Sequence, residues 1–271
     1  MNNNQEIIKT LFPKVYAALH YGSKVAGYGN KTSDNDVIVV IKNYPEKIKY
    51  IYKDNYSFLA VDKKVFEDDC SKTKYGDFVA ARFSGPIIPI INRYYLKKME
   101  IVFKKKVVTI YTTQLIYERK EKALNIKINL AYFPFCKWNE QVTIYRPFRY
   151  SILNTLRSDL KDKNLKMIFP GYKKAIEELQ IFDQVEKNWY QIKPEFIKKV
   201  LKNNKLFPKI EFYLAEAKKA IKRYQTHDLA GGSQTDIVIK DVIHKIDREI
   251  HWQKKGVLNK PEVYLKEQNE N

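Results

Sequence analysis

The chain has few of the residues that mark disulfide-rich, zinc-binding or unstructured proteins. Its two cysteines, Cys70 and Cys136, are too few and too far apart for a disulfide framework or a zinc site, which favours a reducing compartment. Nine glycines and ten prolines among 271 residues, of which 44% are hydrophobic, predict a globular chain rather than a disordered one.

Long apolar segments are also missing. No run approaches the roughly 18–20 apolar residues that a membrane span needs. The first residues, MNNNQEIIKTLF, lack the cationic start and the apolar stretch of a signal peptide. The sequence therefore predicts a cytoplasmic protein without a transmembrane segment.

Acidic residues are outnumbered, since 31 Asp and Glu stand against 50 Lys and Arg, for a formal net charge of +19. Such an excess favours a polyanionic partner, which could be RNA, DNA or an anionic membrane surface. Charge alone does not choose among these partners, and it does not indicate an oligomeric state.

Apolar patterns predict an α+β chain with a small mixed sheet followed by a mainly helical part. Residues 36–41 and 56–62 read as buried strands because they are continuous and β-branched. Residues 5–20 have apolar positions at helical spacing, with Pro13 as a kink, and residues 94–121 have a broad apolar face opposite many lysines.

One stretch carries a specific pattern, HYGSKVAGYGNKTSDNDVIVVI, which covers residues 20–41. A Gly-Ser pair is followed by a loop and then by two aspartates one residue apart at the start of an apolar run. In a strand, residues i and i+2 point to the same face, so the two carboxylates converge on one place. The residues of the pattern are Gly22, Ser23, Gly27, Ser33, Asp34 and Asp36.

This pattern resembles the signature of the DNA polymerase β-like nucleotidyltransferase superfamily. The resemblance implies transfer of a nucleoside monophosphate from a nucleoside triphosphate (NTP), assisted by Mg²⁺, with two ions expected. Asp34 and Asp36 would be metal ligands and catalytic residues, while Gly22, Ser23 and Ser33 would hold the nucleotide. Members usually have an apolar residue where this chain has Asn35, so its amide needs a partner if it is buried.

Superfamily members usually add a third carboxylate from a neighbouring strand. Asp62 is our prediction for this catalytic and metal-binding role because it ends the next strand-like segment, YSFLAVD. Glu100 is the rival, although it falls within the lysine-rich helical pattern. Asp62 could instead cap the helix that begins at KKVFEDD.

A second resemblance concerns the acceptor. Residues 79–86, VAARFSGP, are similar to a motif of the mitochondrial phosphatidate cytidylyltransferase family, with Arg82 and Pro86 in matching places. That family also joins a nucleotidyltransferase domain to a winged-helix-like domain. The match departs at Lys24, where the lipid enzymes have glycine.

We therefore divide the chain into three parts. Residues 1–125 are expected to form the nucleotidyltransferase domain with a linker helix, and residues 126–255 a helical, winged-helix-like domain with short strands around the turn EKN. Residues 256–271 are expected to be a loosely ordered tail.

Three functions remain open. The favoured one is nucleotidyl transfer to RNA, because residues 186–224 hold eleven Lys or Arg against four Glu. In that region Lys198, Lys199, Lys202 and Lys205 are predicted to bind RNA phosphates. The alternatives are CTP-dependent transfer to a phosphatidate-type lipid and a non-catalytic nucleic-acid-binding module. The base preference cannot be read from the sequence.

Overall fold

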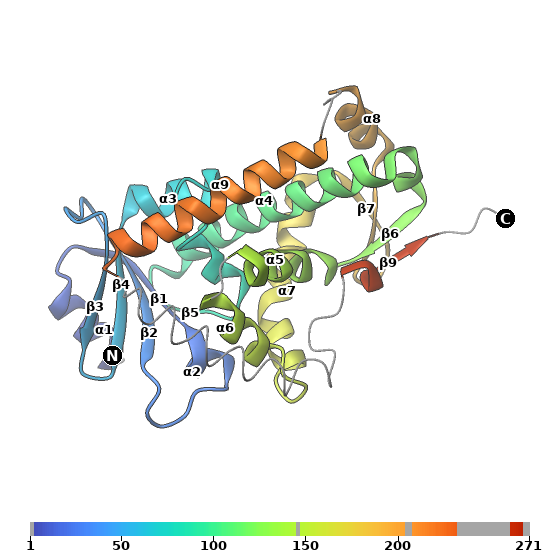
Figure 1. Cartoon of the computed structure of the whole chain (residues 1–271). Helices are drawn as coiled ribbons and strands as arrows, with labels where there is room; N and C mark the ends of the chain where they lie inside the picture. The colour runs from blue at the N-terminus through green and yellow to red at the C-terminus, as the bar shows by residue number, and fades with distance from the viewer. Residues whose placement is uncertain (1–2, 145–146, 204–207, 232–260, 268–271) are drawn as a thin grey trace.

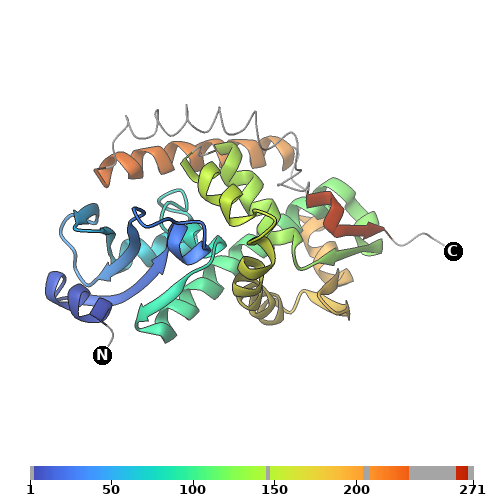
Figure 2. The ribbon, with the colours of Figure 1, turned by 90° about the horizontal axis from the view of Figure 1, so that it is seen from below.

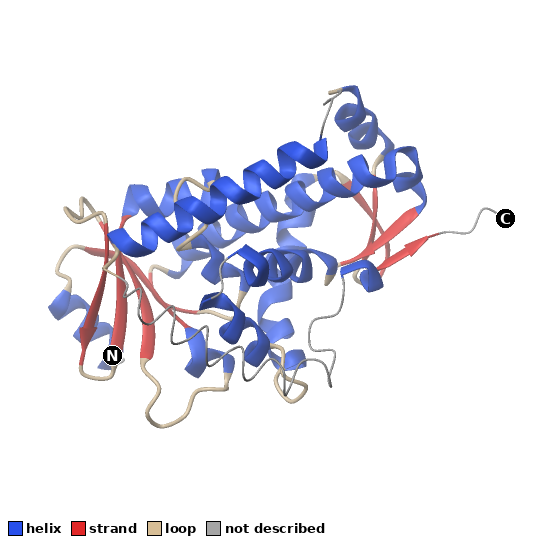
Figure 3. Ribbon diagram, in the orientation of Figure 1, coloured by secondary structure: helices blue, strands red, loops and turns tan. Residues whose placement is uncertain are grey.

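The computed structural model describes residues 3–144, 147–203, 208–231 and 261–267. Two β-sheets lie at opposite ends of the molecule, with helices between and around them (Figures 1 and 3). The fold is α+β, as the sequence predicted.

The first sheet has five strands in the order β3-β4-β2-β1-β5. Strands β2 and β4 are parallel, and the other neighbours are antiparallel, so the sheet is mixed. The elements of this part are α1 (Asn3–Leu11), β1 (Val15–Tyr21), α2 (Gly22–Ala26), β2 (Asn35–Ile41), β3 (Ile48–Lys53), β4 (Tyr56–Asp62), α3 (Lys63–Lys72), η1 (Ala80–Ser84) and β5 (Ile88–Ile91).

The predicted helix over residues 5–20 is only half right. The helix α1 ends at Leu11, and residues 15–21 form the strand β1. This strand lies between β2 and β5, and it is largely buried. An apolar run that is buried on both faces fits helical spacing as well as strand spacing, which explains the error.

Two layers cover the sheet. Alternate residues of β2, Ile38 and Val40, face a large core that includes residues of α3 and of the long helix α4 (Arg93–Arg119). Val37 and Val39 face a smaller core closed by Ile8 of α1. Asp36 therefore shares its face of β2 with the side that α3 and α4 cover.

The second part begins where α4 ends. It contains η2 (Lys120–Asn125), β6 (Ile126–Asn129), α5 (Tyr132–Ile144), α6 (Pro147–Thr155), α7 (Lys161–Leu179), β7 (Phe182–Glu186), β8 (Trp189–Ile192) and α8 (Pro194–Lys202). The winged-helix-like interpretation predicted a short hairpin around EKN, and β7 and β8 form it. Strand β8 pairs back to β6, a strand that the sequence analysis missed.

The structure describes part of the segment 256–271 that was predicted as a loosely ordered tail. Within that range, η3 (Pro261–Tyr264) and β9 (Leu265–Glu267) are ordered, and β9 completes the sheet order β7-β8-β6-β9. Strand β9 pairs with β6 from Ile126 to Ile128, so it satisfies backbone groups of a strand that would otherwise be an edge. The sequence also predicts a helix over 234–250, and this segment lies outside the described residues.

Helix α9 (Pro208–Leu229) returns from the second part to the first (Figures 1 and 2). Beyond its last turn, the carbonyl oxygen of Ala230 accepts a hydrogen bond of 2.8 Å from the amide of Tyr50 in β3. Within the predicted segment 126–255, α9 contacts both α5 of the second part and β3 of the first sheet.

The face of α9 that points inward is polar. Its buried side chains contact α5 and the loop after α3, and with charged side chains of α3 and α4 they form what we call the α9 junction. The carboxylate of Asp77 forms ion pairs with the ammonium groups of Lys106 and Lys137, each with an N–O distance of 2.7 Å. Glu140 lies 2.7 Å from Lys137 and 3.2 Å from Lys219. The junction comprises Asp69, Asp77, Glu140 and Glu216 with Lys106, Lys137, Lys219 and Arg223.

Four carboxylates meet four cations in the α9 junction, and the charges shift the carboxyl pKa values. Burial opposes ionisation of Glu140, but Lys137 and Lys219 outweigh it and lower its pKa to about 2. The pKa of Asp77 is lowered well below its ordinary value, again against burial, by Lys137 and Lys106. Both carboxyls are therefore ionised in the folded protein.

Loop 73–80 owes its shape to one carboxylate. Asp69 accepts four backbone hydrogen bonds, from the amides of Tyr75, Asp77, Val79 and Ala80, at 2.9–3.1 Å. From the other side, Nε of Arg223 donates to the carbonyl of Gly76 at 2.6 Å. The loop that leads into η1 is thus fixed by α3 and α9 together.

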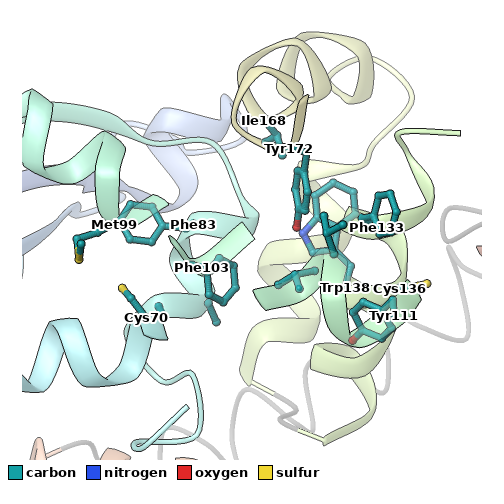
Figure 4. Packing of buried hydrophobic residues seen from close by; sticks show 14 of the residues in the cluster. Cys70, Phe83, Met99, Phe103, Tyr111, Phe133, Cys136, Trp138, Ile168 and Tyr172 are labelled. Carbon is teal, nitrogen blue, oxygen red and sulfur yellow. The ribbon is translucent and has the colours of Figure 1, made fainter. Parts of the chain in front are cut away.

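A continuous apolar core joins the two parts (Figure 4). It runs from Cys70, Phe83 and Met99 through Phe103 to Trp138 and Tyr172 without interruption. Both cysteines are free and buried, in agreement with the prediction of no disulfide. None of the described helices combines the length and apolar character needed to cross a bilayer.

Candidate active site at the start of strand β2

The structure brings the Gly-Ser turn against the second aspartate. Strand β1 ends at Tyr21, whose Cα is paired with that of Asp36 in β2. Gly22 follows with φ +80°, a left-handed conformation that favours glycine. A Cβ at Gly22 would lie 2.0 Å from Oδ2 of Asp36. Two features therefore require glycine at this position: the positive φ of the backbone, and the Asp36 carboxylate, which leaves no space for a Cβ atom.

The two aspartates differ in exposure. Asp34 precedes β2 and is exposed, whereas Asp36 is half-buried within the strand. Between them, Asn35 has the partners that its amide was expected to need. Its Nδ2 donates to the carbonyl of Asn55 at 3.2 Å, and its Oδ1 accepts from Nζ of Lys24 at 3.3 Å. The amide thus ties the start of β2 to the β3–β4 turn and to α2.

The loop between turn and strand is held by its own hydrogen bonds. The amides of Tyr28 and Gly29 donate to the carbonyl of Ser23 at 3.1 and 3.0 Å. The hydroxyl of Ser33 accepts from the amide of Asn30 at 3.0 Å and lies 3.1 Å from Oδ1 of that residue. Ser33, which was predicted to bind nucleotide, stabilises the loop in this structure. Ser23 is half-buried, and its carbonyl accepts the two hydrogen bonds that close the loop.

Arg82 of η1 brings positive charge to the site. Its Cζ lies 4.9 Å from the ring centre of Tyr21, the residue paired with Asp36. Burial raises the pKa of Tyr21 well above its ordinary value; the Arg82 charge works against this rise and the Asp36 charge adds to it. The sequence had indicated Arg82 only through the lipid-enzyme motif, because nothing local shows that it reaches β1 and β2.

Aromatic side chains form the side of the site that faces the second part. The ring of Tyr28 lies edge-on to that of Tyr150 in α6, with centres 6.0 Å apart. Burial raises the pKa of Tyr28 to about 12, partly offset by a hydrogen bond with Ser151, while the Asp36 charge adds to the rise. In the sequence, Tyr150 belongs to an aromatic and arginine-rich stretch, of which Tyr145, Arg146 and Phe148 are outside the described side chains.

Asp62, predicted as the third carboxylate, does not lie beside the aspartate pair in this structure. In the parallel register of β2 and β4, Asp36 is opposite Ser57, and Asp62 is opposite Ile41. Five residues of strand separate the two positions, about 16 Å at ~3.3 Å per residue. Asp62 instead caps α3, accepting from the amides of Lys64 and Val65, and also binds the amide of Tyr44.

Glu100 does not take over that role. It lies on α4 and pairs with the fully buried ammonium of Lys104, beneath Gly171 of α7. Lys104, which the sequence had placed on the polar side of α4, also donates to the carbonyl of Ile168 at 2.9 Å. The ring of His20 lies 3.2 Å from the amide nitrogen of Asn4 and also hydrogen-bonds the backbone of Asp36.

Beside Asp36, the neighbouring strand presents Ser57, which is buried, rather than an acidic residue. Among the residues that the structure describes, no group of three or more His, Cys, Asp or Glu side chains could hold a metal ion. The described metal-binding candidates are therefore Asp34 and Asp36, whose oxygens are the ligand type that Mg²⁺ prefers.

Comparison with known proteins adds no assignment. No protein-family model matches the chain, and no curated protein matches it. The function must therefore be argued from the residues gathered around Gly22 and Asp36.

Proposed function

We propose that the protein is a Mg²⁺-dependent nucleotidyltransferase that moves a nucleoside monophosphate from an NTP to an acceptor. The observation that carries this proposal is the contact between the Gly22 backbone and the Asp36 carboxylate. It puts a turn that a phosphate can approach closely next to a ligand for the metal that accompanies the phosphate.

The residues present fit a bound magnesium ion. Mg²⁺ commonly uses one or two carboxylates and completes its shell with water and substrate phosphates, so Asp34 and Asp36 suffice as protein ligands. When bound, the ion would neutralise charge on the phosphates and favour attack on the α-phosphorus.

The chain's own groups have separate tasks in this reaction. Gly22 and Ser23 allow the triphosphate to approach the backbone, and Arg82 supplies a positive charge near Asp36. The acceptor oxygen forms a bond to the α-phosphorus while the bond to pyrophosphate breaks. A carboxylate of the pair can accept the proton of the attacking hydroxyl.

RNA remains the favoured acceptor, and the net charge of +19 supports it. The alternative is CTP-dependent transfer to a phosphatidate-type lipid, favoured by Arg82 lying at the site as part of the VAARFSGP segment. A non-catalytic nucleic-acid-binding module is the third candidate. The intact Gly22–Asp36 contact speaks against it, since a scaffold without activity has no need for that constraint.

The test is incubation with each labelled NTP, Mg²⁺ and either total RNA or a lipid extract. We expect label in the RNA, release of pyrophosphate, and loss of both when the metal is chelated. Label in the lipid phase would establish the lipid alternative. Absence of transfer to either acceptor, with the protein folded and Mg²⁺ present, would contradict the proposal.

A further inference from the structure

One side of α7 carries a row of exposed lysines. Lys163, Lys166 and Lys173 are spaced so that they lie within one face of the helix. The opposite face, with Ile168, Tyr172 and others, is buried against α4. Within the described chain, no carboxylate is within ion-pairing distance of these three ammonium groups, so their charges are available to a ligand.

The lysine row begins at the candidate active site. A Cβ at Gly27 would lie 3.3 Å from Leu160 and 3.6 Å from Nζ of Lys163. Close by, Nδ2 of Asn164 donates to the carbonyl of Ala26 at 3.0 Å, which fixes the start of α7 on α2. From there the row continues along the helix for about 15 Å, at ~1.5 Å per residue, to Lys173.

An exposed aromatic ring lies against the loop that follows Gly27. Tyr150 of α6 is 40% exposed and contacts Tyr28, the residue after Gly27. Lysines that follow a phosphate backbone, combined with aromatic rings on which bases stack, are the elements of single-strand binding surfaces.

We propose that this surface, formed by Lys163, Lys166, Lys173 and Tyr150, binds the acceptor, and that the acceptor is a single-stranded polynucleotide whose end reaches Asp34 and Asp36. Its role as an acceptor surface depends on the proposed nucleotidyl transfer. A membrane fits this surface less well, because a helix that lies on a bilayer exposes a broad apolar face, and the apolar face of α7 is buried.

The lysines predicted from the sequence to bind RNA provide a matched comparison. Lys198, Lys199 and Lys202 lie on α8, which contacts η2 and α4. Figure 1 shows α8 near the end of α4 that is farther from the first sheet. Lys205 is outside the described residues. These α8 lysines therefore offer the same charge far from the candidate active site.

The experiment measures binding of a labelled single-stranded oligouridylate to the full chain over a range of salt concentrations. The α7 variant Lys163→Ala/Lys166→Ala/Lys173→Ala is compared with the α8 variant Lys198→Ala/Lys199→Ala/Lys202→Ala, which loses the same charge. We expect the α7 variant to bind at least about tenfold more weakly, with a salt dependence reduced by about two phosphate contacts. The α8 variant should remain within about twofold of the unchanged protein.

Further variants test charge and stacking separately. Lys163→Arg/Lys166→Arg/Lys173→Arg should restore binding because it restores the charge, and Tyr150→Ala should weaken binding about fivefold or more. Equal losses in the α7 and α8 variants would overturn the proposal, since they would show a response to net charge alone. The proposal would also be overturned if the α7 variant bound the oligonucleotide as tightly as the unchanged protein. The same holds if the protein bound vesicles of anionic phospholipid in preference to the oligonucleotide.

Failure of this proposal can be told apart from failure of the proposed function. Binding needs no chemistry, so Asp36→Asn should bind the oligonucleotide normally. If the α7 variant transferred nucleotide to RNA or to lipid as fast as the unchanged protein, the proposed enzymatic function would stand. The proposal that the α7 surface binds the acceptor would then be contradicted. If the α7 lysines bound the oligonucleotide but no nucleotidyl transfer occurred, the α7 surface would stand and the proposed enzymatic function would be contradicted.

Discussion

Carboxylates gather in two regions of this molecule, and the two regions treat them differently. In the α9 junction, four buried carboxylates are matched by four cations, and each has a structural partner. At the start of β2, Asp34 is exposed and Asp36 is half-buried against the bare backbone of Gly22. The junction uses its charges to hold elements together, whereas the strand start places two carboxylates beside a backbone turn, with Asp34 exposed to solvent.

The largest expected effect concerns activity at the strand start. Asp36→Asn should lower nucleotidyl transfer at least about a thousandfold, because it removes about 4 kcal/mol of charge stabilisation at the phosphates. The fold should be retained, since Asn has the same shape and Asp36 is only half-buried. Single-turnover transfer and thermal unfolding of the same preparation test both statements. Normal transfer in this variant would remove Asp36 from the active site.

The α9 junction should show the opposite pattern. Asp77→Asn leaves Lys106 and Lys137 without their shared buried partner, so we expect the free energy of unfolding to fall by about 3–5 kcal/mol. Urea unfolding measures this loss. Transfer by the fraction that remains folded should be close to normal. A stable variant would show that the junction adds little to stability.

Acidic pH should destabilise the protein through the α9 junction. The pKa of Glu140 is lowered from 4.5 to about 2 in the folded protein, so its stabilisation is complete above pH 4.5 and is lost as the pH falls toward 2. The unfolding temperature should therefore fall over this interval. Glu140→Gln should be less stable at neutral pH and should show a flatter decline. If the unfolding temperatures of the unchanged protein and of Glu140→Gln fell in parallel as the pH was lowered, Glu140 would not be the source of the acid sensitivity.

The smallest effect is expected at Asp62. Asp62→Ala removes the cap of α3 and should cost about 1 kcal/mol of stability. Transfer should be unchanged, because Asp62 is at the far end of β4 from Asp36. Asp62→Asn is the matched control, since its side chain can still cap the helix. Loss of transfer in both variants at full folding would return Asp62 to the active site.

Much of the fold could be predicted from local patterns. The runs at 36–41 and 56–62 were predicted as strands because they are continuous and β-branched, and they form the adjacent parallel strands β2 and β4. The lysine-rich pattern at 94–121 became α4 with nearly the predicted bounds. The motif assigned Gly22 and Asp36 to one site, but the strand β1 that brings them together was not predicted.

The remaining features depend on pairings across long stretches of chain. Lys137 meets Asp77 across 60 residues, and no local pattern shows that either is buried. Lys104 looked solvent-exposed because its burial depends on Gly171, where α7 approaches α4 closely. The third carboxylate was assigned by chain order, but strand register decides which residues are neighbours, and the register puts Ser57 beside Asp36.

The polar inner face of α9 also has a consequence for how the protein is made. Of the groups in the α9 junction, Asp77 and Glu140 are synthesised together with Lys106 and Lys137, but at that stage Glu140 lacks Lys219 and the carbonyl of Gly76 lacks Arg223. Helix α9 later supplies Lys219 and Arg223 against Glu216, and so brings the missing positive charge. An unbalanced buried carboxylate is unfavourable. The N-terminal sheet and the loop that positions Arg82 are therefore expected to reach their final packing only after translation has passed residue 223, although most of their own residues are made long before.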